Sequence, residues 1–84
     1  MTARFVPSPQ ALAIYMRDQR KAAQLSQSAV SDRVGIRQET VSAFENKPES
    51  TKLETLFKLL SALNLEIQIA EKGAPPSPEW DEEW

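Results

Sequence analysis

Apolar side chains recur at helical spacing through most of this chain, and capping residues mark where helices begin. Ser8 precedes a proline, which is typical of a helix start: the serine oxygen caps free amides, and proline fits the first helical position. Leu12, Tyr15 and Met16 then fall on one face of a helix. This pattern predicts a first helix over about residues 9–23.

A second helix is expected to start at Gln27, with Ser26 as its capping residue. Val30 and Val34 are four residues apart and supply its apolar face. Gly35 follows at once and predicts the end of this helix, because glycine adopts the left-handed conformation that closes helices.

Two more helices follow along the chain. Val41 and Phe44 are three residues apart and predict a third helix, which ends before Pro48 because proline cannot continue it. Thr51 and Glu54 have the spacing of a capping box and predict the start of a fourth. The fourth helix is expected to continue to about residue 64 on a stripe of Leu53, Leu56, Phe57, Leu60 and Leu63.

After the fourth helix the pattern changes period. Leu65, Ile67 and Ile69 alternate with polar residues, which predicts one short strand. A single strand has no partner in an otherwise helical chain, so we expect it to pair with the same strand of a second copy across a two-fold axis. The alternatives are an extension of the fourth helix and a strand that lies on the protein's own surface.

The composition excludes several classes of function. The chain has 84 residues, enough for one small domain, and contains neither histidine nor cysteine. Zinc fingers, histidine-based catalysis and thiol nucleophiles are therefore excluded, and no metal site or cofactor is expected. With only two glycines, no phosphate-cradling loop and no paired-carboxylate site, we do not expect an enzyme. No apolar run approaches membrane-spanning length and no signal core is present, which predicts a cytoplasmic protein.

The net charge of −2 argues, taken alone, against a nucleic-acid partner, but the charges are unevenly placed. Residues 1–70 carry nine basic and seven acidic side chains, a balance of +2. Residues 71–84 carry one lysine and five acids, a balance of −4, together with three prolines in four residues. We therefore expect a folded domain over 1–70 and a disordered acidic tail over 71–84, with the boundary near Gly73.

Residues 27–46 have the spacing of a helix-turn-helix. Ser31 is a small residue where the two helices approach most closely, and Gly35 makes the turn. The second helix then presents its polar residues outward, at a width that fits the major groove of DNA. The wedge between the two helices is expected to contain Val30, Val34, Ile36, Val41 and Phe44. An ordinary helical hairpin is the alternative.

The stretch from about Arg17 to Leu65 resembles the lambda-repressor-like, or Xre, helix-turn-helix family. The similarity is carried by Leu25-Ser26-Gln27, Val30-Ser31, Val34-Gly35-Ile36, Val41-Ser42 and Phe44-Glu45. Ser31 departs from the alanine usual in the family, but serine is small enough to pack there. The resemblance implies an all-α bundle of four to five helices, here with one short C-terminal strand that pairs across a homodimer.

The same resemblance implies which polar residues bind DNA. Gln27 matches a position that typically contacts a phosphate and braces the recognition helix, and Gln38 and Glu39 match positions that reach base edges. Glutamine suits adenine, and glutamate can accept from cytosine N4. The implied DNA-binding set is Gln27, Arg37, Gln38, Glu39, Thr40, Ser42, Ala43 and Lys47. A solvated helix face is the alternative for each of them.

Arg20 and Glu45 match a pair that forms a partly buried salt bridge in this family. The resemblance gives this structural ion pair the role of tying the first helix to the end of the third, outside the base-contacting set. Two solvated surface charges are the alternative.

The whole architecture is similar to the HipB-type antitoxins, which partner HipA serine/threonine-kinase toxins. Residues 35–46 and 51–58 carry most of this similarity, together with a tail that ends in Glu-Trp. It implies a type II antitoxin that dimerises, represses its own operon through palindromic operator DNA and neutralises a HipA-like kinase toxin. Trp80 and Trp84 are the implied toxin-binding anchors, because tryptophan is a preferred interface residue; a solubilising tail is the alternative.

Two other functions stay open at this point. One is a stand-alone phage-like transcriptional repressor without a toxin partner. The other is a protein-interaction adaptor that uses the helix-turn-helix scaffold without binding DNA.

Overall fold

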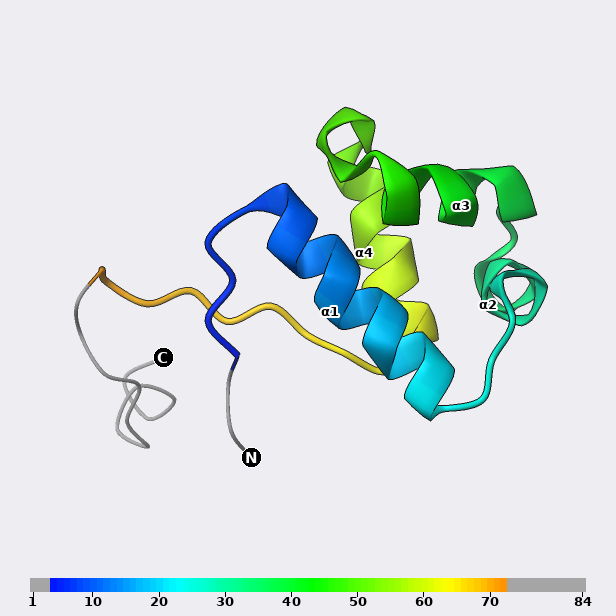
Figure 1. Cartoon of the computed structure of the whole chain (residues 1–84), viewed down its shortest axis with the longest axis horizontal. Coiled ribbons are helices and arrows are strands. Elements are labelled where there is room, and N and C mark those ends of the chain that lie inside the picture. Colours follow the sequence, from blue (N-terminus) through cyan, green and yellow to red (C-terminus); the bar gives the residue numbers. More distant parts are fainter. Residues whose placement is uncertain (1–3, 73–84) are drawn as a thin grey trace.

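The computed structural model describes residues 4–72, which form four α-helices and one short 3-10 turn (Figure 1). The elements are α1 (Pro9–Ala22), α2 (Gln27–Val34), α3 (Gln38–Asn46), η1 (Pro48–Ser50) and α4 (Leu53–Ala62). α2 packs against both α3 and α4, while α1 packs against α3 and η1. The prediction of an all-α helix-turn-helix fold is confirmed.

Two serines start helices as their positions in the sequence predict. The Ser8 hydroxyl oxygen accepts from the Ala11 amide at 3.1 Å, and Pro9 occupies the first position of α1. The Ser26 hydroxyl accepts from the Ala29 amide at 3.0 Å at the start of α2. Each contact satisfies one of the amides that a helix start leaves without a backbone partner.

Helices α1, α2 and α4 end in the same way, with one residue in the left-handed conformation. These residues are Gln24 at φ 59°, Gly35 at φ 70° and Asn64 at φ 58°. After each of them, the next amide bonds back to a carbonyl five residues earlier; for example, the Leu65 amide donates to the Leu60 carbonyl at 2.8 Å. This arrangement satisfies carbonyls at the helix end and turns the chain sharply.

The core lies where α1, α2, α3 and α4 meet. Its largest fully buried side chains belong to Met16, Leu59, Val30 and Val41, with Phe44 close behind. One side chain comes from α1, one from α2, two from α3 and one from α4. Detachment of any one helix would therefore expose the core. Removing any of these large side chains would leave a cavity that the others only partly fill.

The start of α4 differs from the prediction. Its capping residue is Lys52, which makes no side-chain hydrogen bond, so the capping box expected from Thr51 and Glu54 is wrong. The Thr51 amide donates to the Pro48 carbonyl at 3.0 Å and closes η1 instead. Because the Thr51 amide closes η1, α4 begins only at Leu53. Glu54 lies in the first turn of α4, where its negative charge interacts favourably with the helix dipole.

The apolar stripe of α4 is also only partly a core stripe. Leu60 is buried and Leu56 and Leu63 pack at the edge of the core, but Leu53 is 71% exposed and Phe57 is 56% exposed. Leu59, outside the expected stripe, is buried instead. α4 therefore carries apolar surface that the described residues 4–72 leave exposed.

Residues 65–72 leave the bundle as an irregular segment on the side away from α2 and α3 (Figure 1). Because α4 ends at Ala62 and Asn64 turns the chain, the alternative of a longer fourth helix is excluded. Within this single copy the segment forms no strand ladder, so strand pairing between copies stays a prediction. Among the helices of residues 4–72, none has both the length and the apolar character needed to cross a membrane.

Candidate nucleic-acid interface

Helices α2 and α3 form the helix-turn-helix. Val30 and Ser31 of α2 and Val41 and Phe44 of α3 are buried between the helices and the rest of the core. Gly35 makes the turn, and Val34 and Ile36 cover the edge of the core beside it. The buried side of α3 is thus fixed by packing, and its other side remains free.

The outer side of α3 carries most of the residues implied to contact DNA. Arg37, Gln38 and Glu39 at its start are exposed, as are Ala43 and Lys47 near its end, while Thr40 and Ser42 are half-buried. No side-chain hydrogen bond caps the helix at Arg37, so the first amides of α3 are not capped by their own side chains. This end of a helix carries partial positive charge and is suited to a phosphate.

Two side chains at the start of the motif are held in a direct contact. The Ser28 hydroxyl, on the first turn of α2, donates to the Gln38 side-chain oxygen at 2.9 Å. The Ser28 carbonyl in turn accepts from the Ser31 hydroxyl at 2.8 Å. The first base-contacting candidate on α3 is therefore braced from α2.

An ion pair joins α1 to the end of α3. The Arg20 guanidinium donates from Nε to one Glu45 oxygen at 2.7 Å and from a terminal nitrogen to the other at 3.0 Å. Arg20 also donates to the Leu25 carbonyl at 2.8 Å. The two side chains are only 11% and 8% exposed, so this is a buried, two-point contact rather than a pair of solvated charges.

Gln27 is hydrogen-bonded to the end of α3. Its amide nitrogen donates to the Glu45 carboxylate at 3.1 Å, which adds a third helix to the ion pair. The resemblance implied that Gln27 braces the recognition helix, and it does so at the far end of α3 rather than at the start. The brace at the start is Ser28, which sequence reasoning missed; its position one residue after Gln27 was the available signal.

The remaining site residues lie away from this surface. Leu65 is half-buried, and Ile67 and Ile69 are exposed along the segment after α4. The two tryptophans of the tail lie outside the described residues.

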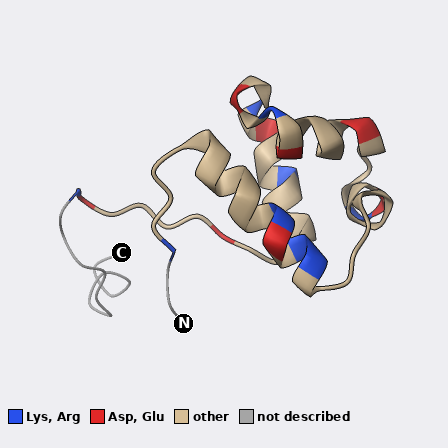
Figure 2. Cartoon of the chain, viewed as in Figure 1, with Lys and Arg blue, Asp and Glu red and all other residues tan. Residues whose placement is uncertain are grey.

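Figure 2 shows where the charged residues lie along the ribbon. In α1 they all lie in the C-terminal half, whereas α3 carries two acidic residues, Glu39 near its start and Glu45 near its end. Exposed apolar side chains belong instead to the N-terminal arm, α1, α4 and the segment after it, namely Phe5, Val6, Ile14, Leu53, Phe57, Ile67 and Ile69.

Comparison with known proteins gives a consistent result. Residues 16–69 match the family described as Helix-turn-helix. The chain is 37% identical to Antitoxin HipB of Escherichia coli O6:H1 over 87 aligned residues, covering 100% of this chain and 93% of that protein. A solved "HipA-HipB-O2-O3 complex" contains a chain that superposes with a TM-score of 0.81 at 36% identity, covering 83% of this chain and 99% of that chain. A "HipB-O4 20mer complex" superposes with a TM-score of 0.80 at the same identity and coverage.

Proposed function

Because the chain belongs to the helix-turn-helix family, among the relatives of the HipB antitoxins, we propose that it is itself a DNA-binding antitoxin. It binds palindromic operator DNA as a homodimer, represses its own operon and holds a HipA-like serine/threonine-kinase toxin inactive. Its role is binding rather than catalysis, and it acts in the cytoplasm. Residues 1–70 supply the DNA-binding and dimerisation domain, and residues 71–84 supply the tail.

The outward polar face of α3 is the observation that carries the DNA-binding part of this proposal. Packing against α1, α2 and η1 fixes the orientation of the helix, and the exposed residues at its start can enter the major groove. Arg37 and Lys47 lie at its two ends, where positive charge can contact the phosphates that flank a groove. The net charge of +2 over residues 1–70 doubles when two copies bind the same duplex.

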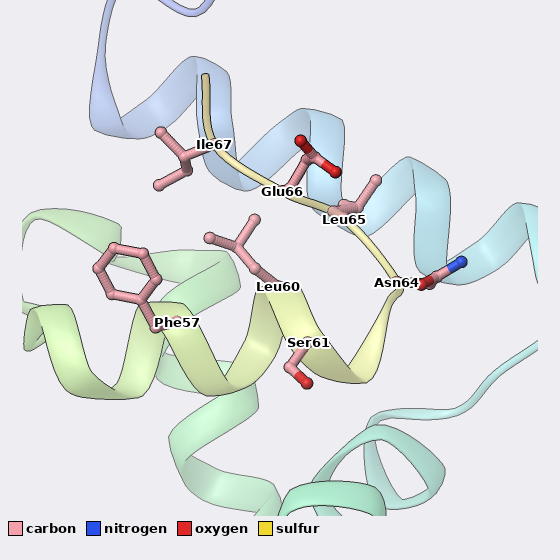
Figure 3. A pocket seen from close by; sticks show the side chains of 7 residues that line it. All are labelled: Phe57, Leu60, Ser61, Asn64, Leu65, Glu66 and Ile67. Carbon is pink, nitrogen blue, oxygen red and sulfur yellow. The ribbon is translucent and has the colours of Figure 1, made fainter. Parts of the chain in front are cut away.

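The uncovered apolar face of α4 supports the dimer. The exposed side chains of Phe57 and Ile67 and the buried Leu60 line a groove between α4 and the segment that follows it, with Ile67 facing the two α4 side chains (Figure 3). Large exposed apolar side chains in a cluster are typical of a surface that a partner covers. Pairing of residues 65–70 with the same segment of a second copy would close the open strand edge and cover this groove.

The tail supports the toxin-binding part of the proposal. Trp80 and Trp84 stand among acidic residues, and an aromatic anchor with charged neighbours fits an apolar pocket with a basic rim. The solved complexes of similar chains include one with HipA and one with a 20mer, which supports two partners rather than one. This favours the antitoxin over a stand-alone repressor or an adaptor without DNA.

DNA binding is tested by selecting duplexes from a random pool with the purified protein and measuring their affinity at several salt concentrations. We expect enrichment of a palindrome and an affinity that falls steeply with salt. Gln38→Ala should cost about 1–3 kcal/mol at one base-pair position per half-site. Failure to enrich any sequence would exclude repression by direct operator binding.

Toxin binding is tested by calorimetry with the purified kinase partner. Deletion of Trp84 should weaken toxin binding and leave duplex binding unchanged, because the proposal assigns toxin binding to the tail and DNA binding to α3. A truncation that leaves toxin affinity at the wild-type level would remove the assigned role of the tail.

A further inference from the structure

We infer that the groove between α4 and the segment after it receives Ile69 of a second copy, because the two segments pair antiparallel in a register centred on Ile67. This inference rests on the homodimer of the proposed function. It adds to that homodimer the residue that lies on the two-fold axis and the side chain that fills the groove of Figure 3.

Residues 65–69 already have the side-chain alternation of a strand. Ile67 points toward Phe57 of α4, whereas the Glu66 carboxylate points away from α4 (Figure 3). The Gln68 side-chain amide donates to the Glu66 carboxylate at 3.4 Å, so these two polar side chains share the outer face. Because side chains alternate along an extended chain, the apolar residues of the segment face the bundle.

The apolar face of this segment is covered at one end and open at the other. Leu65 is half-buried against the core, Ile67 is 43% exposed and Ile69 is 86% exposed. The Leu65 amide donates to the Leu60 carbonyl, but residues 66–72 make no backbone hydrogen bond to the rest of the described chain. An open backbone edge beside an exposed apolar face is suited to pairing with another strand.

The order of residue types identifies the other strand as a second copy of the same segment. In residues 65–69, apolar and polar types alternate and read the same in both directions from Ile67. A two-fold axis pairs a surface with itself, so a segment with this symmetry is complementary to its own copy. Directly opposite residues of an antiparallel pair lie on one face, which keeps the apolar side chains of both copies on the side of the helices.

Among registers near the middle of the segment, one matches every residue type. Centred on Ile67, the pair places Leu65 of each copy opposite Ile69 of the other. It also places Glu66 opposite Gln68, a carboxylate beside an amide. Centring the pair on Glu66 would place two carboxylates together, and centring it on Gln68 would place Leu65 opposite an acid. An axis between two residues would place apolar side chains opposite polar ones.

This register places Ile69 of the second copy over the groove. Leu65 lines the groove, and the residue opposite it in an antiparallel pair lies about 4.5–5.5 Å away on the same face. Ile69 is the most exposed large apolar side chain of residues 4–72, and the pairing removes it from water. By the two-fold symmetry, Ile69 of the first copy enters the groove of the second.

Disulfide cross-linking of the full chain tests the register, because the sequence contains no cysteine. A cysteine at the centre of the pair meets its own copy at about 4.5–5.5 Å between Cα atoms, which a disulfide spans, and a cysteine one position away does not. Ile67→Cys, Glu66→Cys and Gln68→Cys are oxidised separately, with Ser50→Cys, at an exposed position of η1, as the control. A mixture of Glu66→Cys and Gln68→Cys is oxidised after subunit exchange.

We expect Ile67→Cys to cross-link in most chains and the other three variants to remain largely free when oxidised alone. The mixture should cross-link, because Glu66 and Gln68 are opposite; this test leaves Ile67 in place. Ile69→Ala should raise the dimer dissociation constant, measured by sedimentation, on the order of 100-fold, because two isoleucines per dimer lose burial. The conservative Ile69→Val should change it only a few-fold.

The outcomes separate this inference from the proposed function. Cross-linking of Glu66→Cys or Gln68→Cys alone in place of Ile67→Cys overturns the register while the homodimer stands, and so does equal cross-linking of Ser50→Cys. A dissociation constant that Ile69→Ala leaves at the wild-type value overturns the occupant of the groove. A wild-type protein that sediments as a monomer at the same concentration overturns both the inference and the proposed homodimer.

Discussion

Replacing Arg20 with methionine is the most direct test of how the recognition helix is held. The substitution keeps most of the apolar stem and removes the guanidinium. Glu45, which is 8% exposed, then keeps only the Gln27 amide at 3.1 Å as a hydrogen-bond donor. Breaking a buried pair by removing one partner costs about 3–5 kcal/mol, because the remaining charge is left without compensation.

This loss is large for a chain of this size. At about 0.05–0.15 kcal/mol per residue, 84 residues give a free energy of unfolding of about 4–13 kcal/mol. Arg17→Met is the matched control on the same helix: Arg17 is 43% exposed and its nearest acid, Asp18, lies 3.9 Å away. An exposed pair of this kind contributes less than about 1 kcal/mol.

The assay is urea unfolding followed by circular dichroism, with all variants at one protomer concentration because dimerisation contributes to apparent stability. The double variant Arg20→Met/Glu45→Leu removes both charges and should cost less than Arg20→Met alone. The reasoning is refuted if Arg20→Met costs no more than Arg17→Met, or if the cost of the double variant equals the sum of its two single variants.

Three further predictions concern helix ends and use the same unfolding assay. Ser26→Ala removes the acceptor for the Ala29 amide and should cost about 1 kcal/mol; an unchanged midpoint would show that the cap is dispensable. Gly35→Ala should also cost about 1 kcal/mol, and since no atom lies within 4 Å of the added carbon, the cost is the left-handed backbone alone. Gln24→Gly should stabilise the domain by about 0.5–1 kcal/mol, because glycine adopts the left-handed conformation without strain. Asn64→Gly should change the free energy of unfolding little, because asparagine tolerates this conformation. Equal effects of the two substitutions would contradict this reasoning.

Much of the fold could be predicted from local chemistry. Ser8, Ser26 and Gly35 act at helix ends through contacts with their own neighbours in sequence, so their residue types are sufficient evidence. Thr51 shows the limit of this reasoning. Its spacing to Glu54 fits a capping box, but the preceding proline-led turn takes its amide, and that turn is stabilised by packing against α1 and α3.

The site was predictable in its location and less so in its contacts. Periodicity identifies α3 and its outward face, because the buried Val41 and Phe44 determine which side remains free. It cannot show which polar side chains bond to one another, and so the contacts of Ser28 and Gln27 were not foreseen. Phe57 illustrates a related limit: apolar spacing does not distinguish a core position from one that remains exposed.

The contacts around Glu45 also govern the local unfolding of the domain. Glu45 joins side chains from α1 and α2 to the last turns of α3, so α3 cannot open at that end without breaking all of them. Amide hydrogens in the middle of α3 should therefore exchange only when the whole domain unfolds, together with those of α1. A recognition helix whose last turns do not fray reaches DNA with that end already ordered, so binding there restricts only exposed side chains.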